Sequence, residues 1–537
     1  MRRSRQTRFI FTAFALAALL IASPAARADK DAPKVHDPIK IGNVTIDNRI
    51  ARSSLAGITC GEFGDVSQQR INMEANFAAG GPGLIISSHV PIREDGRVLP
   101  NYATIHDDRL IEQWAKVVKA VEQNGSKYFM QLSHSGRQQD IGGVRNYSYA
   151  DDRTDKTPLW RKALPFARKS PRVRPPSPGS VPDSFHGLKG RPMTTQEMKE
   201  MVQSFIQAAQ RAAKAGVHGL ELHSSNGYFF TQCISSAAND RKDRYGGDLE
   251  GRFTFWKEVI EGIKKDPIAG KLPLVVKLSV IEDGNALKPW AHKGNTLAES
   301  IQVAKMAEKA GADAIHVSAG DIFPHPRNPA GYLPTEMLRD TYPGLYTSGK
   351  FSKLNFKLLR AVPWALRLAW ERRLRKELYG GSTLDYLRGK QPDVNGPKAG
   401  WRGVQGLLAD SAHQIKKNVK TAKVLVTGGW QELAPIQEGL AKGHFDMITS
   451  ARTFMANMDL PKQLVAASKR GDKNYTPKSP CDACNRCLVA APKHPVMCMS
   501  AQRFGGDVKA MQDAGQRMYT QPPKRQTVRR LPVVQKH

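Results

Sequence analysis

Short apolar runs alternate with longer amphipathic segments along most of the chain. Between the runs lie stretches such as MKEMVQSFIQAAQRAAKAG, in which apolar residues recur at helical spacing and a glycine follows. Eight strand–helix units in series predict an α/β fold, a closed (β/α)8 TIM barrel. The expected strands are residues 52–56, 84–88, 128–132, 218–222, 274–278, 314–318, 424–427 and 446–449.

Polar residues follow several of these strands at the point where each strand ends. Active sites of (β/α)8 barrels form at the carboxyl ends of the strands, so these positions predict a site there. Gln131 ends the third strand and His134 lies beyond it. The fourth strand ends in His223, the fifth in Lys277 and the seventh in Gly428 and Gly429, and Arg452 follows the eighth.

The connection between the sixth and seventh strands is far longer than a usual barrel loop. We expect an insertion at about residues 335–410. It contains the basic, tryptophan-bearing segment NFKLLRAVPWALRLAWERRLRKELYG at residues 355–380. This segment is typical of a helix that contacts a membrane surface or a partner protein, and equally of a helix that packs over the barrel.

The N-terminus has the pattern of an export signal. The basic stretch MRRSRQTR precedes an apolar run at residues 9–22, and Ala26-Arg27-Ala28 fits a cleavage site. We therefore expect residues 1–28 to be a signal peptide and the protein to be exported to the periplasm. The alternative is a membrane anchor, although the run is shorter than the ~20 residues a span needs.

The formal net charge is +32. A strongly basic balance favours anionic substrates or anionic lipid, and a solvated basic surface is the plainer interpretation. No compact nucleic-acid recognition motif accompanies the charge, so nucleic acid is not an expected partner.

Four of the six cysteines lie in a short C-terminal stretch, at Cys481, Cys484, Cys487 and Cys498. Three closely spaced cysteines and one more distant one are typical of a 4Fe-4S cluster. Tetrahedral zinc and disulfides are the alternatives. We therefore expect a barrel domain at residues 29–470 and a Cys-rich iron–sulfur tail at residues 471–537.

Two further patterns indicate binding chemistry. Gly428, Gly429 and Arg452 follow the last two strands, where barrels often bind phosphate through backbone N–H groups and a guanidinium.

The stretch ELHSSNGYFFTQ brings His223, Asn226 and Tyr228 within six residues after the fourth strand. These three could serve a substrate, or merely cap and pack the next helix.

Taken together, these stretches resemble the Old Yellow Enzyme family of FMN-dependent NAD(P)H:flavin oxidoreductases. The resemblance covers roughly residues 36–500. It is nearest to the iron–sulfur subgroup that contains 2,4-dienoyl-CoA reductase and trimethylamine dehydrogenase. The stretches that carry it are NRIARSSLAG, AAGGPGLIISSHV, FMQLSHSGRQ, GVHGLELHSSNGYFFTQCISSAANDRKDRYGGDLEGR, VVKLS, ADAIHVSAG, VLVTGGW, FDMITSART and CDACNRCL.

The resemblance implies an FMN-binding barrel and assigns residues to the cofactor. Gln131 and Lys277 would contact the pyrimidine edge of the flavin, and Lys277 would stabilise its anionic reduced form. Backbone around Ser54, Leu55 and Ala56 would line the ring system. Gly428, Gly429 and Arg452 would hold the phosphate.

The resemblance also assigns catalytic roles. His223 and Asn226 would hydrogen-bond a substrate oxygen, and Tyr228 would protonate the substrate carbon. Asn226 stands where dienoyl-CoA reductases usually have His, which favours enone chemistry. Ala56 replaces the Thr or Cys that many relatives carry near the flavin.

The electron route is a separate expectation. The C-terminal dinucleotide-binding domains of the iron–sulfur relatives are expected to be absent. NAD(P)H would then reduce the flavin directly, or a redox partner protein would exchange electrons through the cluster.

The resulting hypothesis is an FMN and 4Fe-4S enzyme that reduces or forms activated C=C bonds of enone or enoyl substrates. One alternative is an amine or N-methyl dehydrogenase that passes electrons to a partner protein. A third is a zinc-stabilised barrel that binds anionic ligands or a membrane without catalysis.

Overall fold

The computed structural model describes residues 32–61, 64–98, 101–138, 175–184, 187, 189–286, 290–339, 357–380, 399–491 and 495–522. The expected signal peptide at residues 1–28 and parts of the expected insertion and tail lie outside these ranges. Export therefore stays a prediction.

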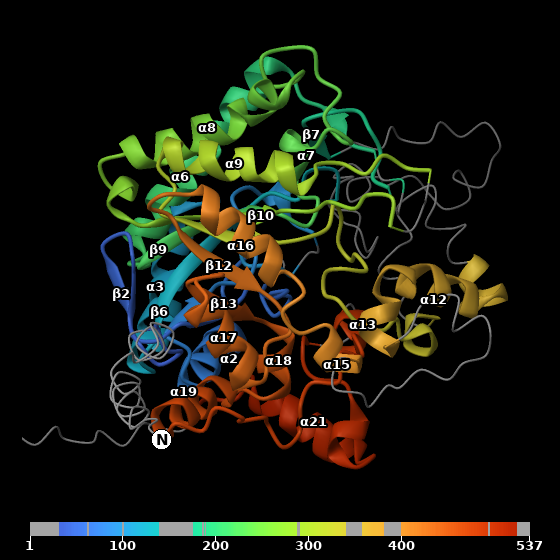
Figure 1. The fold of residues 1–537 in the computed structure, drawn as a ribbon. Coiled ribbons are helices and arrows are strands. Elements are labelled where there is room, and N and C mark those ends of the chain that lie inside the picture. Colours follow the sequence, from blue (N-terminus) through green and yellow to red (C-terminus); the bar gives the residue numbers. More distant parts are fainter. Residues whose placement is uncertain are drawn as a thin grey trace, which may run out of the picture.

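Eight parallel strands form a closed barrel (Figure 1). Each strand pairs with the next in chain order, β4 pairs with β6, and β13 pairs with β3 to close the ring. The predicted (β/α)8 barrel is therefore confirmed. Its strands are β3 (Ile50–Arg52), β4 (Leu84–Ile86), β6 (Lys127–Ser133), β9 (Gly219–Ser224), β10 (Leu274–Ser279), β11 (Ala314–Ser318), β12 (Lys423–Thr427) and β13 (Met447–Ser450).

The first strand differs from its expected position. It was expected at residues 52–56, but β3 ends at Arg52, where its pairing with β13 and β4 stops. Residues 53–56 leave the barrel at its carboxyl end instead of continuing the strand. A sequence pattern can show that a strand is present, but it does not show where pairing with the neighbouring strands stops.

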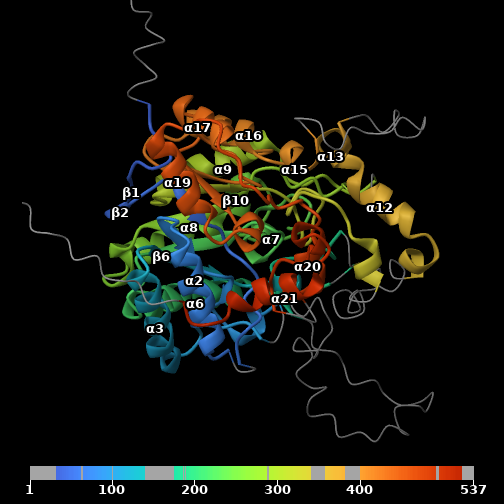
Figure 2. The same ribbon diagram turned by 90° about the horizontal axis from the view of Figure 1, so that it is seen from below.

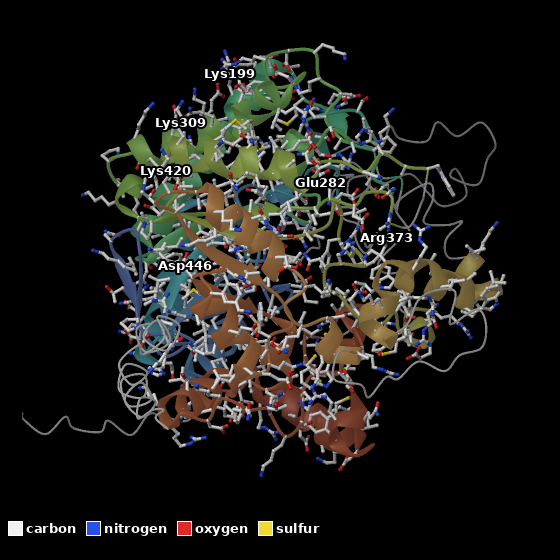
Figure 3. The ribbon with its side chains drawn as sticks, in the orientation of Figure 1. Lys199, Glu282, Lys309, Arg373, Lys420 and Asp446 are labelled. Carbon is white, nitrogen blue, oxygen red and sulfur yellow. The ribbon has the colours of Figure 1, made fainter. Side chains whose placement is uncertain are left out.

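Helices surround the barrel (Figure 2). Two of them begin with capping boxes, in which Thr194 pairs with Glu197 and Thr296 with Glu299. The main outer helices are α2 (Gln68–Ala79), α3 (Ile111–Gln123), α6 (Thr195–Lys214), α8 (Leu249–Lys265), α9 (Leu297–Ala310), α16 (Ala409–Asn418), α17 (Leu433–Ala441) and α19 (Leu460–Arg470). Exposed lysines such as Lys199, Lys309 and Lys420 project from or beside this layer (Figure 3).

An apolar layer fills the amino end of the barrel. A hairpin of β1 (Ile39–Ile41) and β2 (Val44–Ile46) lies across this end. Its isoleucines share one buried cluster with inward residues of the strands, among them Phe129, Val275 and Met447. Because described side chains pack this end, we expect a ligand to bind at the carboxyl end of the barrel.

The described part of the long insertion forms α12 (Pro363–Glu371) and α13 (Arg375–Tyr379), which lie beside the barrel (Figure 1). Leu366 and Trp370 are buried in a cluster that also holds Leu333 and Val489, so α12 packs on one side. On the other side Trp364 is 67% exposed, and contact of this face with a membrane surface stays a prediction. Among the described residues, no helix has the length and apolarity to cross a membrane.

The C-terminal segment packs directly against the barrel (Figure 1). It includes α20 (Arg486–Ala490) and α21 (Val508–Arg517). Asn72 and Asn76 of α2 donate hydrogen bonds to backbone oxygens of Tyr519 and Thr520. The described part of the tail is therefore held by the barrel's own helices.

A buried charge cluster ties α2 to the first strand. The Glu74 carboxylate pairs with the guanidinium groups of Arg52 and Arg70, and all three side chains are at most 1% exposed. Arg52 also stacks over Phe77, and Arg70 over Trp114. One carboxylate is thus the shared counter-charge of two cations that are out of reach of water.

We predict that Glu74→Gln lowers the free energy of unfolding by about 3–5 kcal/mol, because it leaves two buried guanidinium groups without a counter-charge. Urea-induced unfolding followed by circular dichroism measures this. Glu438→Gln is the matched control, since Glu438 pairs with Lys442 on the exposed face of α17, and it should change stability by less than about 0.5 kcal/mol. Equal effects of the two variants would contradict the prediction.

Candidate active site

A cavity opens at the carboxyl end of the barrel, and its empty volume of about 860 Å³ includes space that is open to solvent. Its wall comes from the ends of several strands, from the loop after β11 and from the C-terminal segment. The lining residues are Ser53, Ser54, Leu55, Ala56, His89, Tyr102, His223, Asn226, Tyr228, Lys277, Phe323, Asn328, Pro329, Thr427, Ala451, Arg452, Met455, Cys487, Leu488, Ala491 and Val496.

The three residues singled out in the stretch after the fourth strand all reach this cavity. His223 lies in β9, and a tight turn then leads to Tyr228, which precedes α7 (Phe229–Ile234). The turn has two consecutive left-handed residues, Asn226 (φ 63°) and Gly227 (φ 71°). Asn and Gly are the residues that adopt this conformation most readily, so the local sequence explains the turn.

Hydrogen bonds orient Asn226. Its backbone N–H donates to Ser279 Oγ at 3.3 Å, and its side-chain Oδ1 accepts from Ser225 Oγ at 2.6 Å. With its acceptor engaged, the amide presents its N–H₂ donors to the cavity. Asn226 is therefore set up to donate to a ligand oxygen.

Burial sets the protonation states of His223 and Tyr228. Burial and the nearby Lys277 charge hold the pKa of His223 well below its usual value, so the imidazole is neutral. Burial, with Tyr102 adding to it, raises the pKa of Tyr228 well above its usual value. The centroids of the His223 and Tyr228 rings are 4.9 Å apart. A neutral imidazole and a protonated phenol thus face one space.

Two residues that the sequence did not single out complete this group. The His89 ring lies 5.1 Å from that of Tyr228 and 5.6 Å from that of His223, and Tyr102 lies 5.3 Å from His89. Burial lowers the pKa of His89 to about 3. His89 follows the second strand, so the strand-end rule could have found it. Tyr102 lies in a loop and gives no such signal.

Five of the residues expected to hold the cofactor line the cavity: Ser54, Leu55, Ala56, Lys277 and Arg452. The Lys277 ammonium donates to Ser53 Oγ at 3.3 Å. Burial lowers the pKa of Lys277, while the Glu221 carboxylate opposes that effect. Lys277 is therefore a buried basic group at the cavity wall.

Gln131 is absent from the cavity lining and lies in a buried polar network. Its amide donates to Glu221 at 2.6 Å and accepts from Ser54 Oγ at 2.7 Å. The other oxygen of Glu221 contacts His316 Nδ1 at 2.6 Å. Gln131 thus lies next to cavity residue Ser54, and its contact with a flavin stays a prediction.

Gly428 and Gly429 are also absent from the lining. The Gly428 N–H donates to Thr449 O at 3.2 Å, and its carbonyl accepts from Ser450 Oγ at 2.8 Å. Gly429 has open space around it, since an added Cβ would meet only ordinary contacts. Their role at a phosphate stays a prediction.

The loop with the clustered cysteines forms one wall of the cavity through Cys487. Two residues between the cysteines, Ala483 and Asn485, are left-handed. Arg503 Nη1 lies 3.2 Å from Cys498 Sγ. All six cysteines are free thiols, and among the described side chains no three His, Cys, Asp or Glu converge on a single metal-ion position. The 4Fe-4S cluster stays a prediction.

Arg452 connects the barrel to this loop. It begins α18 (Arg452–Ala456), and its guanidinium donates to Asn485 Oδ1 and to Ala330 O. Its Nε has no hydrogen-bond partner in the described structure. Arg452 therefore keeps its Nε–H unused, while Nη1 holds the cysteine loop through Asn485 and Nη2 holds the loop after β11 through Ala330.

Comparison with known proteins identifies relatives of this site and fold. Residues 34–341 match the NADH:flavin oxidoreductase / NADH oxidase family. An NADH oxidase of Thermoanaerobacter brockii is 34% identical over 54% of this chain, and an NADPH dehydrogenase of Bacillus velezensis is 32% identical over 54%. The matched part spans 39% of the first relative and 74% of the second.

Among solved structures, a 2-naphthoyl-CoA reductase in complex with 2-naphthoyl-CoA is similar in fold. The similarity covers 90% of this chain and 58% of that one, with a TM-score of 0.62 and 20% identity. It supports the barrel architecture.

We predict that Gly227→Ala disrupts the turn that carries Asn226. A methyl group there would overlap the backbone oxygen of Asp321, so the clash adds about 1–3 kcal/mol to the ~1 kcal/mol strain of a left-handed alanine. Gly443→Ala is the control, because Gly443 has φ 64° and nothing within 4 Å. A thermal-unfolding difference between the variants measures the clash. Equal melting temperatures would show that the turn tolerates a side chain.

Proposed function

The chain belongs to the NADH:flavin oxidoreductase / NADH oxidase family, and we propose that it is an FMN-dependent enzyme that reduces, or in reverse forms, activated C=C bonds of enone or enoyl substrates. The family match confirms the flavin oxidoreductase class that the sequence motifs indicated. The observation that carries the proposal is the convergence of His223, Asn226 and Tyr228 on one cavity.

The cavity residues fit FMN. Lys277 supplies a buried positive charge, and Arg452 Nε is a buried donor without a partner. Residues 53–56 would line the ring system, and Arg452 with Gly428 and Gly429 would hold the phosphate. Bound FMN supplies the hydride in this chemistry.

The protein's own residues polarise the substrate and supply the proton. The Asn226 amide donates to the carbonyl oxygen of the substrate, and the neutral His223 donates a second hydrogen bond. Both strengthen as negative charge develops on that oxygen. Tyr228 keeps its phenolic proton at neutral pH, because burial raises its pKa, and transfers it to the α carbon. NAD(P)H is the proposed electron donor.

We also propose a 4Fe-4S cluster on Cys481, Cys484, Cys487 and Cys498. The spacing supports it, and Cys487 lies in the cavity wall, which would place the cluster beside the flavin. Burial raises the pKa of Cys487 to about 12, so this thiol stays protonated until iron binds and takes it as a thiolate. The cluster would relay electrons to or from a redox partner protein.

An amine or N-methyl dehydrogenase is the second candidate. The cysteine loop at the cavity wall favours it, because such an enzyme needs a route for electrons to a partner protein. The Asn226 donor and the Tyr228 acid favour a carbonyl-activated double bond instead. The two candidates differ in whether an enone or an amine reacts with the flavin.

We predict that anaerobic purification yields FMN together with about four iron and four sulfide per chain. Absorbance and metal analysis measure both. Cys484→Ser should lose the iron and keep the flavin, because Cys484 is outside the cavity lining. A colourless protein that contains one zinc would contradict both cofactor assignments, and a flavoprotein without iron would contradict the cluster alone.

We predict that Tyr228→Phe slows reoxidation of the reduced enzyme by 2-cyclohexenone by about 10²–10⁴-fold, the usual contribution of a general acid. Stopped-flow absorbance measures this step, and flavin reduction by NAD(P)H should be unaffected. Tyr475→Phe is the control, since Tyr475 bonds Gln463 outside the cavity. An unchanged rate would remove Tyr228 as proton donor. Reduction of the flavin by trimethylamine, without reaction with the enone, would favour the amine dehydrogenase.

A further inference from the structure

The segment after the last clustered cysteine places a guanidinium beside that cysteine. Arg503 lies in the short 3-10 helix η6 (Ala501–Phe504), five residues after Cys498. Its Nη1–H donates to Cys498 Sγ at 3.2 Å. Both side chains are partly exposed and neither lines the active-site cavity, whereas Cys487 does. The contact is therefore on a side of the cysteine loop that the cavity does not reach.

The rest of the Arg503 guanidinium is anchored, which gives Nη1 a fixed direction. Nε donates to Pro480 O at 2.9 Å, and Nη2 donates to Ser479 O at 2.7 Å and to Ala456 O at 3.0 Å. A further acceptor, Asn457 Oδ1, lies 3.0 Å from Nη2. A planar guanidinium that is held at Nε and Nη2 has little freedom to turn. The Nη1–H is thus directed at the cysteine sulfur by the chain around it.

The four clustered cysteines lie close enough to affect one another. Burial is the main cause that raises the pKa of Cys487, and the neighbouring Cys481 and Cys498 add to it. Burial also raises the pKa of Cys484, and Cys487 is among the groups that add to it. In a 4Fe-4S cluster each cysteine binds a different iron, so the four sulfurs surround the cluster and need not meet at one ion position. The arrangement therefore fits the proposed cluster.

We propose that Arg503 is a positioning residue of the proposed 4Fe-4S site, and that its Nη1–H···Sγ bond to Cys498 raises the reduction potential of the bound cluster. This inference rests on the cluster proposed above and adds a residue to it. The reduced state of such a site carries one more negative charge than the oxidised state. A charge-assisted hydrogen bond to a ligand sulfur stabilises the more negative state more strongly. Hydrogen bonds to the sulfurs are among the factors that set the potential of iron–sulfur clusters.

Other charged groups face the cysteine loop at different cysteines. Arg452 is on the cavity side, where its charge opposes the effect of burial on the pKa of Cys487. Asp482 lies at Cys484, whose backbone N–H it accepts at 3.3 Å. Arg503 is the cation at the remaining, partly exposed cysteine. A variant of Arg503 therefore changes one side of the site and leaves the expected flavin side in place.

A purely structural role is the alternative. The contacts of Arg503 to Ser479 and Ala456 tie the start of the cysteine loop to the end of α18. A residue that acts only as such a clamp would affect stability and iron content, but it would not change the energy of the reduced state. The reduction potential of the iron-loaded protein therefore separates the two roles.

An EPR-monitored redox titration of the anaerobically purified full chain, with dithionite as the reductant, tests the proposal. Arg503→Gln should shift the midpoint potential of the cluster to a more negative value. The potential of FMN should stay unchanged, because neither Arg503 nor Cys498 lines the cavity. Arg503→Lys keeps a positive charge and should cause a smaller shift. Arg517→Gln is the matched control, since it removes an exposed arginine of α21, and its cluster potential should equal that of the wild type.

A measurement on the wild-type protein keeps the test valid if Arg503→Gln does not fold or retains no iron. Protein made with ¹⁵N-labelled arginine should show a nitrogen coupling in the pulsed EPR spectrum of the reduced cluster, because Nη1 donates directly to a ligand sulfur. Arg503→Lys should lose this coupling.

Three results would overturn the role of Arg503. They are a wild-type spectrum without the nitrogen coupling, a coupling that persists in Arg503→Lys, and equal midpoint potentials of iron-loaded wild type and Arg503→Gln. A wild-type chain that binds no iron is a separate result, because it would contradict the cluster itself.

Discussion

The turn of residues 225–228 is the constraint on which the active-site cavity depends. It requires two successive left-handed residues, and one of them must lack a side chain because the backbone of Asp321 packs against it. Asn226 satisfies the first position with a polar side chain that reaches the active-site cavity. Gly227 satisfies the second and leaves room for Asp321. The position of Asn226 at the active-site cavity and the close approach of Asp321 to Gly227 thus follow from one local backbone conformation.

The interior of the barrel changes along its axis from apolar at the amino end to polar toward the carboxyl end. At the amino end, side chains such as Phe129 and Val275 pack with the hairpin isoleucines. Toward the carboxyl end, Glu221 joins Gln131 and His316 in one hydrogen-bonded network. Burial raises the pKa of Glu221, but His316 and Lys277 more than offset this and hold it below its usual value. An ionised carboxylate beneath the cavity therefore supports the positive charge of Lys277 at its wall.

The sequence predicts the barrel well because each strand–helix unit repeats the same two patterns. These are a short apolar run for the strand and apolar residues at helical spacing for the helix. All eight expected strands are present, and only the first differs clearly in position, because strand pairing decides where β3 ends. The His223, Asn226 and Tyr228 motif could be placed because its residues are close in the chain and follow a strand. The spacing of residues that lie close together in the chain can be read directly from the sequence.

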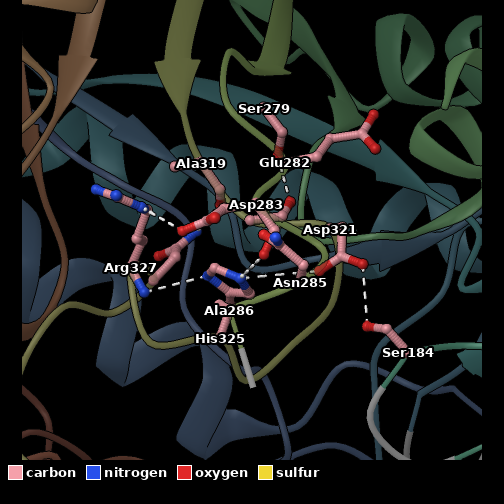
Figure 4. Close-up of polar contacts among 12 residues, drawn as sticks. Ser184, Ser279, Glu282, Asp283, Asn285, Ala286, Ala319, Asp321, His325 and Arg327 are labelled. Atoms are coloured by element: carbon pink, nitrogen blue, oxygen red, sulfur yellow. Dashed lines mark hydrogen bonds and ion pairs between the residues drawn. The ribbon is translucent and has the colours of Figure 1, made fainter. Parts of the chain in front are cut away.

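Contacts between distant segments were harder to predict. Gln131 faces Glu221 in the neighbouring strand, and this register is set by the closed sheet. Tyr102 reaches the cavity from a loop with no pattern of its own. Arg327 and Arg373 both pair with Asp283 (Figure 4 shows the Arg327 contact), although they come from different segments of the chain. Which charges meet depends on the whole fold.

The cysteine loop is itself part of the wall of the candidate active site. Cys487, Leu488, Ala491 and Val496 are part of the cavity wall, and Arg452 binds the loop through Asn485. The same arginine is expected at the FMN phosphate, where its Nε is still unused. A change that breaks the contact between Arg452 and Asn485 would therefore also act on a residue that is expected at the cofactor. This arginine is the direct physical link between the cysteine loop and the expected phosphate site.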